Sequence, residues 1–337
     1  MKNIERDNTI DVLKGIGILL IIAGHINFEP VGGSIISYLY TFNVAIFFFV
    51  AGLLWKKKKV DDFGIFIFSK FKSILIPYIV FVLISLAYGH IVVRLMGEYV
   101  VPFDLSDTLK ALIFSSEWLN SVPTFNFALW FLPIFFIANI CFYFLQLVEI
   151  KTIYLSIIAT LFLVSLPFQE LVPGRPILSI NVLPVALVLM GLGYIWANWF
   201  KSPNISYIFI FIFVCFSIWL TIEQPGNIAN IDSYWFYLSA LLSILIYQKL
   251  AIDLKESRIL LFLGANSLIV YGLHGIVSNI YRFTGIPQYL EQNWSGLALW
   301  MVNLVFVVVV TSAITVTYLQ LKRIIFARKM NSIVFEK

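Results

Sequence analysis

Residues 10–25 read IDVLKGIGILLIIAGH, an apolar run long enough for a helix that also carries an acid, a base and a histidine. Because a helix rises about 1.5 Å and turns about 100° per residue, Lys14 and His25 lie about 16 Å apart along the axis on nearly the same face. Asp11 lies on that side too, where its carboxylate can pair with the lysine. A lipid-facing position would exclude such groups, so we predict that this helix contributes to a functional site.

The composition of the whole chain predicts that this helix lies in a membrane. Hydrophobic residues make up 61% of the 337 residues and charged residues only 12%, and the mean hydropathy is +0.93. A soluble domain carries about 25% charged residues. We therefore predict an all-α polytopic membrane protein, in which residues 1–337 form a single membrane domain with no appended soluble domain.

About ten segments have the length and apolar character of transmembrane helices, which need about 20 residues to cross about 30 Å of hydrocarbon. These segments are residues 12–28, 35–55, 73–95, 126–148, 153–169, 180–199, 205–222, 234–250, 259–281 and 297–320. The longest stretch between them, residues 96–125, is expected to form the largest outer loop.

The lysines and arginines orient these helices. When the N terminus is placed in the cytoplasm, the cytoplasmic segments hold all of the 23 Lys and Arg residues except Arg94, Lys110, Arg175 and Arg282. Basic residues are retained on the cytoplasmic side, whereas acidic residues have little influence. Both termini are therefore predicted to be cytoplasmic. The lysines and arginines that set this orientation also account for the net charge of +5. The sequence lacks the pattern of basic residues interleaved with aromatic residues that is typical of nucleic-acid binding, so we expect no nucleic-acid partner.

The predicted orientation places all three histidines in the outer half of the membrane. His25 lies at the outer end of the first span, His90 in the outer part of the third, and His274 beyond the midplane of the ninth. A shared depth favours a common polar cavity that opens outward, although His90 is better explained as an interfacial residue. Because no H-x-x-x-H pattern or partnering carboxylate motif accompanies them, we expect no metal site.

Five segments form a recognisable series along the chain. They are IDVLKGIGILLIIAGH (residues 10–25), FNVAIFFFVAGLLWKKKK (42–59), FSKFKSILIPY (core 69–78), LWFLPIFF (129–136) and LGANSLIVYGLHG (263–275). Together with ten spans, this order resembles the acyltransferase 3 family of integral membrane acyltransferases, and within it the fucose 4-O-acetylase-like branch. In that family the first helix carries a basic residue, usually Arg, ahead of an essential His, and Lys14 and His25 match these positions.

Two features depart from the family pattern. Lys14 stands where many members have Arg, and a lysine contacts a phosphate as a point charge without the two-pronged fork of a guanidinium. The R-x-x-R pattern common before the proline of the third span becomes Lys70-x-x-Ser73, with Lys72 between them. The run Lys56–Lys59 is explained most simply as an anchor beside anionic lipid, with attraction of a nucleotide phosphate as the second interpretation.

The resemblance implies an O-acyltransferase, most often an O-acetyltransferase, in the inner (cytoplasmic) membrane of a bacterial cell. Its donor would be cytoplasmic acetyl-CoA or another acyl-CoA, and its acceptor a hydroxyl of a surface polysaccharide or a lipid-linked sugar. The resemblance gives Lys14, Lys70 and Lys72 the binding of the donor nucleotide. His25 would act as a general base or be acylated itself, and the sequence leaves both routes open. Asp11 would orient Lys14 or balance its charge.

Four further residues are candidates for substrate binding. Asn43, Trp130 and His274 are polar or amphipathic groups within predicted spans, where they would line a cavity or equally well join helices by hydrogen bonds. Glu117, in the outer loop, would present a carboxylate to a sugar. The neighbouring Trp118 is more simply an interface anchor.

Two other classes of function were weighed against the enzyme. A transporter or flippase for lipid-linked saccharides also needs many spans and a polar cavity, but the chain has no paired inverted repeat with broken helices. A membrane scaffold without activity would not need the basic residue and histidine on one face of the first helix. The acceptor sugar, its hydroxyl position, the acyl chain and the oligomeric state do not follow from the sequence.

Overall fold

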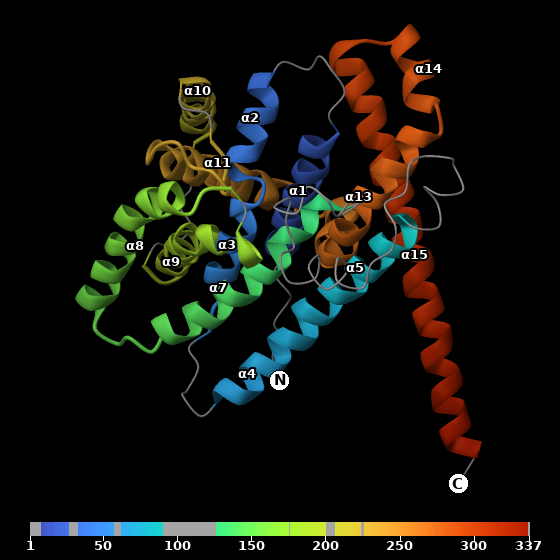
Figure 1. Ribbon diagram of the computed structural model, residues 1–337, viewed down its shortest axis with the longest axis horizontal. Helices are drawn as coiled ribbons and strands as arrows, with labels where there is room; N and C mark the ends of the chain where they lie inside the picture. The colour runs from blue at the N-terminus through green and yellow to red at the C-terminus, as the bar shows by residue number, and fades with distance from the viewer. Residues whose placement is uncertain are drawn as a thin grey trace.

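The computed structural model describes residues 8–26, 33–56, 62–89, 126–174, 176–199, 206–223 and 226–335. Within these ranges the chain is almost entirely helical and has no strand, the only β-type pairing being an isolated bridge between Asn227 and Asn230. The α-helices lie close together, and the C-terminal part of the last one projects beyond the others (Figure 1). The predicted all-α class is therefore confirmed.

The α-helices, in chain order and with the labels of Figure 1, are α1 (Asn8–His25), α2 (Gly33–Phe42), α3 (Ala45–Leu53), α4 (Phe63–Lys70), α5 (Ile76–Tyr88), α7 (Phe131–Leu145), α8 (Lys151–Leu171), α9 (Leu183–Trp199), α10 (Tyr207–Glu223), α11 (Trp235–Asp253), α12 (Arg258–Ala265), α13 (Ser267–Phe283), α14 (Ile286–Asn293) and α15 (Gly296–Phe335). A π-helix, η2 (Phe71–Leu75), joins α4 to α5, and two 3₁₀ helices, η4 (Phe127–Trp130) and η5 (Ile177–Val182), precede α7 and α9.

Eight helical stretches among the described residues are long and apolar enough to cross a membrane. The helix α10, at 17 residues, is a shorter apolar helix at the place of the seventh expected span. The ninth expected span is bent: α12 and α13 meet at 88° around Asn266, whereas the sequence predicted one continuous segment. The structure therefore confirms a polytopic membrane protein and corrects the shape of its ninth span.

The helix α1 lies among many others, contacting α2, α3, α11, α12, α13 and α15. Its contact with α12 is close because both helices present glycines there. A Cβ atom at Gly15 would collide with the carbonyl oxygen of Leu260, and one at Gly264 would collide with the carbonyl oxygen of Asp11. Small residues let membrane helices approach at backbone distance, so α12 fixes the part of α1 that carries Asp11 and Lys14.

Two irregular turns place side chains of the site. The helices α2 and α3 are separated at Asn43 and Val44, so the second span is interrupted at a buried asparagine. Further along, α4, η2 and α5 form one long helix that begins at Phe63, ten residues before the expected boundary. Pro77 has no N–H to bond back to the preceding turn, which is where the π-helix lies.

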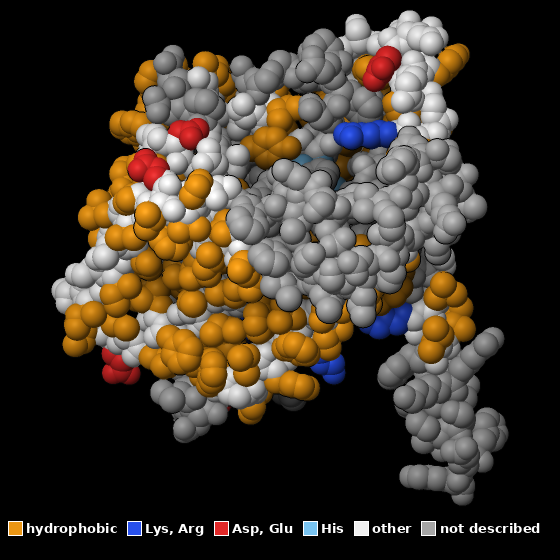
Figure 2. Space-filling model, in the orientation of Figure 1, with side chains coloured by type: hydrophobic (Ala, Val, Ile, Leu, Met, Phe, Trp, Pro, Cys, Tyr) orange, Lys and Arg blue, Asp and Glu red, His pale blue; other side chains and the backbone are white. Residues whose placement is uncertain are grey.

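The outer surface of the molecule is largely apolar. Figure 2 shows hydrophobic side chains over much of the face formed by α7, α8 and α9, with charged side chains toward its upper and lower edges. Exposed large hydrophobic residues such as Leu163 on α8 and Phe211 on α10 have 61% and 69% of their surface accessible. Such a surface requires a hydrocarbon environment, which agrees with a membrane-embedded protein.

Candidate active site

Two histidines that are 249 residues apart in the chain meet inside the protein. Nδ1 of His25, the last residue of α1, lies 2.8 Å from Nε2 of His274 on α13. The ring centroids are 5.1 Å apart and the ring planes 8° from parallel, so the two rings meet edge to edge in nearly the same plane. His274 is completely buried, and its Nδ1 lies 2.6 Å from the carbonyl oxygen of Tyr271. The structure therefore joins two of the site residues named from the sequence.

The end of α1 that carries His25 is held by side chains from two other helices. The hydroxyl of Tyr40 on α2 donates a hydrogen bond of 2.7 Å to the carbonyl oxygen of Gly24. The indole N–H of Trp300 on α15 donates one of 3.2 Å to the carbonyl oxygen of Ala23. Helix ends leave carbonyl groups without partners, and these two bonds satisfy them where a membrane supplies no water. The backbone that carries His25 is consequently fixed.

A buried amide group lies close to the end of α1 that carries His25. Asn43 is 1% exposed, and its Oδ1 accepts a bond of 2.8 Å from the backbone N–H of Val44, which leaves Nδ2 as a buried donor without a recorded partner. This Nδ2 lies 3.5 Å from where a Cβ of Gly24 would be, one residue from His25. A buried donor without a partner costs about 1 to 3 kcal/mol, which points to a role in binding.

At the other end of the functional face of α1, Lys14 and Asp11 form the expected ion pair. Nζ of Lys14 lies 2.7 Å from Oδ1 of Asp11, and the lysine side chain is 25% exposed against 9% for the aspartate. The aspartate therefore holds the ammonium group in place while part of the lysine stays accessible. Such pairing lowers the cost of keeping a charge in an apolar interior.

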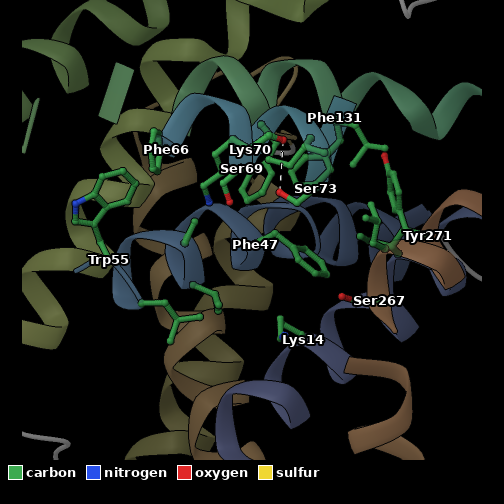
Figure 3. Close-up of a pocket in the computed structure, with 18 of the residues that line it drawn as sticks. Lys14, Phe47, Trp55, Phe66, Ser69, Lys70, Ser73, Phe131, Ser267 and Tyr271 are labelled. Atoms are coloured by element: carbon green, nitrogen blue, oxygen red, sulfur yellow. Dashed lines mark hydrogen bonds between the residues drawn. The ribbon is translucent and has the colours of Figure 1, made fainter. Parts of the chain in front are cut away.

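A cavity of about 510 Å³ opens next to Lys14. Its volume lies within the usual range for small-molecule sites, about 300 to 1,000 Å³. In Figure 3, Lys14 on α1 and Ser69, Lys70 and Ser73 lie on opposite sides of the cavity. The other lining residues are Ile21, Phe47, Val50, Ala51, Leu54, Trp55, Lys56, Phe66, Ile74, Phe131, Leu132, Phe135, Ser267, Leu268 and Tyr271.

The cavity is elongated and differs in character along its length. Trp55 and Phe66, whose ring centroids are 5.4 Å apart, lie at one end, whereas Ser267 and Tyr271 lie at the other (Figure 3). Tyr271 also belongs to the histidine cluster, because its carbonyl oxygen contacts His274. The cavity therefore reaches the helix turn that holds the second histidine.

The lysines named from the sequence occupy different positions around this cavity. Lys70 lines it and lies 5.5 Å from the centroid of the Phe66 ring. Lys56, the first residue of the four-lysine run expected to act as an anchor, also lines it. Lys72 lies on η2, is exposed and is not among the lining residues. The cavity is therefore bordered by Lys14, Lys56 and Lys70.

Of the candidates not yet placed, the structure describes only Trp130. Trp130, at the end of η4, is 6% exposed and does not line it. Glu117 and His90 lie outside the residues that the structure describes. Among the described residues, no three His, Cys, Asp or Glu side chains are grouped so that they could hold a metal ion.

Five residues around the histidines and the cavity were not predicted from the sequence: Tyr271, Trp55, Tyr40, Trp300 and Asn126. Asn126 directly precedes η4, and its Nδ2 donates a bond of 2.7 Å to the carbonyl oxygen of Gly272, one residue from Tyr271. Aromatic residues are abundant in this chain, at 17%, so their number alone gave no signal. The nearest signal was the segment LGANSLIVYGLHG, in which Tyr271 and His274 stand one helical turn apart.

Comparison with protein families gives one match that covers nearly the whole chain. The family model Acyl_transf_3, described as an acyltransferase domain, matches residues 7–319. This range includes both histidines and every lysine that borders the cavity. No curated protein and no solved structure matches the chain.

Proposed function

The chain belongs to the acyltransferase 3 family and is a multi-pass membrane acyltransferase, and we propose that it transfers an acetyl group from acetyl-CoA to a hydroxyl of a carbohydrate. The observation that carries this proposal is the arrangement along α1. A cavity bordered by lysines lies at its Lys14 end, and a pair of histidines lies at its His25 end.

The cavity fits the donor. An acyl-CoA carries phosphates at one end and a thioester at the end of a long, largely uncharged arm. We place the phosphates among Lys14, Lys56 and Lys70, the three lysines that border the cavity, and the arm along the apolar walls toward Tyr271. Lysine ammonium groups bind phosphates as point charges. In the predicted orientation this end faces the cytoplasm, where acyl-CoA is made.

The histidine pair fits the chemical step. A neutral imidazole can accept a proton from a hydroxyl group and later return it. As the hydroxyl oxygen attacks the thioester carbonyl carbon, a C–O bond forms and the C–S bond breaks. His25 takes the hydroxyl proton and returns it to the departing sulfur, so that the products are an ester and CoA thiol. The Lys14 to His25 rise of about 16 Å allows donor and acceptor to enter from opposite sides.

Asn43 supplies a hydrogen-bond donor beside the reacting groups. Its Nδ2 is buried, without a recorded partner, and close to Gly24. The thioester carbonyl oxygen gains negative charge during attack, and a fixed donor in a dry site stabilises that charge. We assign Nδ2 of Asn43 this role.

The acceptor enters from the His25 end, which is the outer half of the membrane in the predicted orientation. This placement supports a sugar hydroxyl of a surface polysaccharide or of a lipid-linked precursor as the acceptor, in the inner membrane of a bacterial cell. This proposed activity matches the one expected for the fucose 4-O-acetylase-like branch, which the sequence resembles. The family match gives the transporter alternative no support.

The proposal is tested with radiolabelled acetyl-CoA added to membranes that contain the wild type or His25→Ala, together with the native glycan. Cys215→Ala, at an exposed position on α10, is the control for insertion and expression. We expect label in the glycan with the wild type and with Cys215→Ala, and about a 10²- to 10⁴-fold lower rate with His25→Ala. Transfer by His25→Ala at the wild-type rate would contradict the catalytic assignment.

A further inference from the structure

We propose that His274 is a positioning residue that fixes the tautomer of His25, so that Nε2 of His25 is the nitrogen that takes the proton from the acceptor hydroxyl. The role of His274 in catalysis rests on the proposed function. The position of the proton on each ring can be measured in the absence of any reaction.

The proton positions follow from the partners of His274. A carbonyl oxygen only accepts, so Nδ1 of His274, at 2.6 Å from the carbonyl of Tyr271, must carry a hydrogen and donate it. A neutral imidazole has one N–H, so Nε2 of His274 is an acceptor. Nδ1 of His25, 2.8 Å away, must then be the donor in the bond between the rings. This leaves the lone pair of His25 on Nε2.

The surroundings of His274 favour its neutral form, in which the ring carries a single N–H. The side chain is completely buried between helices. Its recorded side-chain partners among the described residues are His25 and the ring of Tyr271, and no carboxylate is among them. An imidazolium without a counter-charge in such a place would be strongly unfavourable.

The turn of α13 that carries the Tyr271 carbonyl group, the last acceptor in this series of hydrogen bonds, is itself held in place. The hydroxyl of Tyr271 donates to the carbonyl oxygen of Ala128, and Nδ2 of Asn126 donates to the carbonyl oxygen of Gly272 at 2.7 Å. Both bonds tie this turn of α13 to the segment around η4. The rings of the two histidines, 8° from parallel, are therefore aligned by a fixed backbone.

A histidine and a backbone carbonyl thus do here what a carboxylate does beside a catalytic histidine elsewhere. A partner that accepts from Nδ1–H holds the ring in one tautomer and stabilises the imidazolium that forms during reaction. A carboxylate in the same place would carry a buried negative charge, which is costly in a membrane interior. The neutral chain from His25 through His274 to Tyr271 avoids that charge.

Substitutions separate positioning from packing. His274→Phe keeps an aromatic ring that fills the buried position but has no acceptor for Nδ1–H of His25. We expect kcat to fall about ten- to a hundredfold with little change in the KM for acetyl-CoA. His274→Gln offers an amide oxygen as an acceptor and is expected to recover part of the loss. Tyr281→Phe, on the same face of α13 and bonded instead to Asn303 at 2.6 Å, is the matched control and keeps wild-type kcat.

The direct readout is ¹⁵N NMR of the protein labelled at histidine, in nanodiscs without substrate. The chain has three histidines, so the ring signals of His25 are assigned by their loss in His25→Ala. We expect wild-type His25 to show a protonated Nδ1 and an unprotonated Nε2, and His274→Phe to lose this single tautomer.

The outcomes separate this inference from the proposed function. A protonated Nε2 on His25 in the wild type overturns the inference, as does wild-type kcat in His274→Phe. If the wild type acetylates no glycan, the proposed function fails, and the NMR result still decides the tautomer.

Discussion

The two ends of α1 are built in different ways. At the Lys14 end, the key contact is local: Lys14 pairs with Asp11 three residues away, and Lys14 lines a cavity that two further lysines also border. At the His25 end, the key contact joins residues 249 positions apart, and the surrounding bonds come from α2, α13 and α15. The Lys14 end carries a charged pair whose lysine is partly accessible, and the His25 end carries a half-buried histidine that contacts a fully buried one.

Under the proposed function, this difference separates two tasks within one site. Binding a charged donor needs positive groups that can be reached, and such groups work from flexible side chains. Proton transfer needs fixed geometry in a dry environment, because a misplaced base loses much of its effect. Substitutions at the Lys14 end should therefore change KM for the donor, and substitutions at the His25 end should change kcat.

The largest effect among the variants that sharpen this contrast is expected for Asn43→Ala. Removing a donor from the site of developing negative charge lowers kcat by about 10²- to 10³-fold. The substitution removes a buried unpaired donor but also the oxygen that accepts from the Val44 N–H, so it has opposing effects on thermal stability. Asn139→Ala is the matched control, because Asn139 is equally buried at 1% exposure, has an unpartnered Oδ1, and lies on α7 outside the cavity lining. Both variants are compared by kcat and melting temperature, and equal kcat for Asn43→Ala and wild type would exclude the donor role.

A smaller effect is expected for Lys14→Ala. Loss of a charge-assisted contact to phosphate costs about 1.5 to 3 kcal/mol, which raises the KM for acetyl-CoA roughly 10- to 150-fold. Lys14→Arg keeps the charge and much of the affinity. Lys249→Ala is the control, since Lys249 forms a similar ion pair with Asp253 at 2.8 Å on α11, away from the cavity. A KM that is the same for Lys14→Ala and Lys249→Ala would remove Lys14 from donor binding.

The smallest effect distinguishes Lys70 from Lys72. Lys70 lines the cavity and Lys72, two residues on, does not. A partly exposed charge contact is worth at most about 1 kcal/mol, so Lys70→Ala is expected to raise KM about two- to fivefold, with no measurable change for Lys72→Ala. Steady-state kinetics over a range of acetyl-CoA concentrations measures both. A larger effect at Lys72 would place the donor phosphates on the other side of η2.

The sequence was informative where the physics is local. Hydropathy over about 20 residues identified the helices, because crossing hydrocarbon requires that length. The spacing of Asp11 and Lys14 predicted their ion pair, which the structure contains at 2.7 Å. The bend at Asn266 was missed because a long apolar window averages over it. Asn266 and Ser267 are residues that favour helix boundaries, and they were the signal for this break.

The sequence was uninformative where the contact depends on how helices pack. It placed His25 and His274 at a similar depth, but no periodicity on α1 or α13 shows that these two helices are neighbours. The cavity wall could not be predicted for the same reason, because Trp55, Phe66 and Tyr271 come from three separate segments. Both features depend on side chains that only the folded chain brings together.

The central claim is that donor binding and proton transfer lie at opposite ends of α1. It is tested most directly by measuring, in one preparation of His25→Gln, the Kd for acetyl-CoA by titration calorimetry and the rate of acetyl transfer to the native glycan. Glutamine keeps hydrogen bonding but is not a base near neutral pH. We expect a Kd within about twofold of wild type and a rate lower by about 10²- to 10⁴-fold. A wild-type rate, or a Kd that weakens in proportion to the lost rate, would contradict the account.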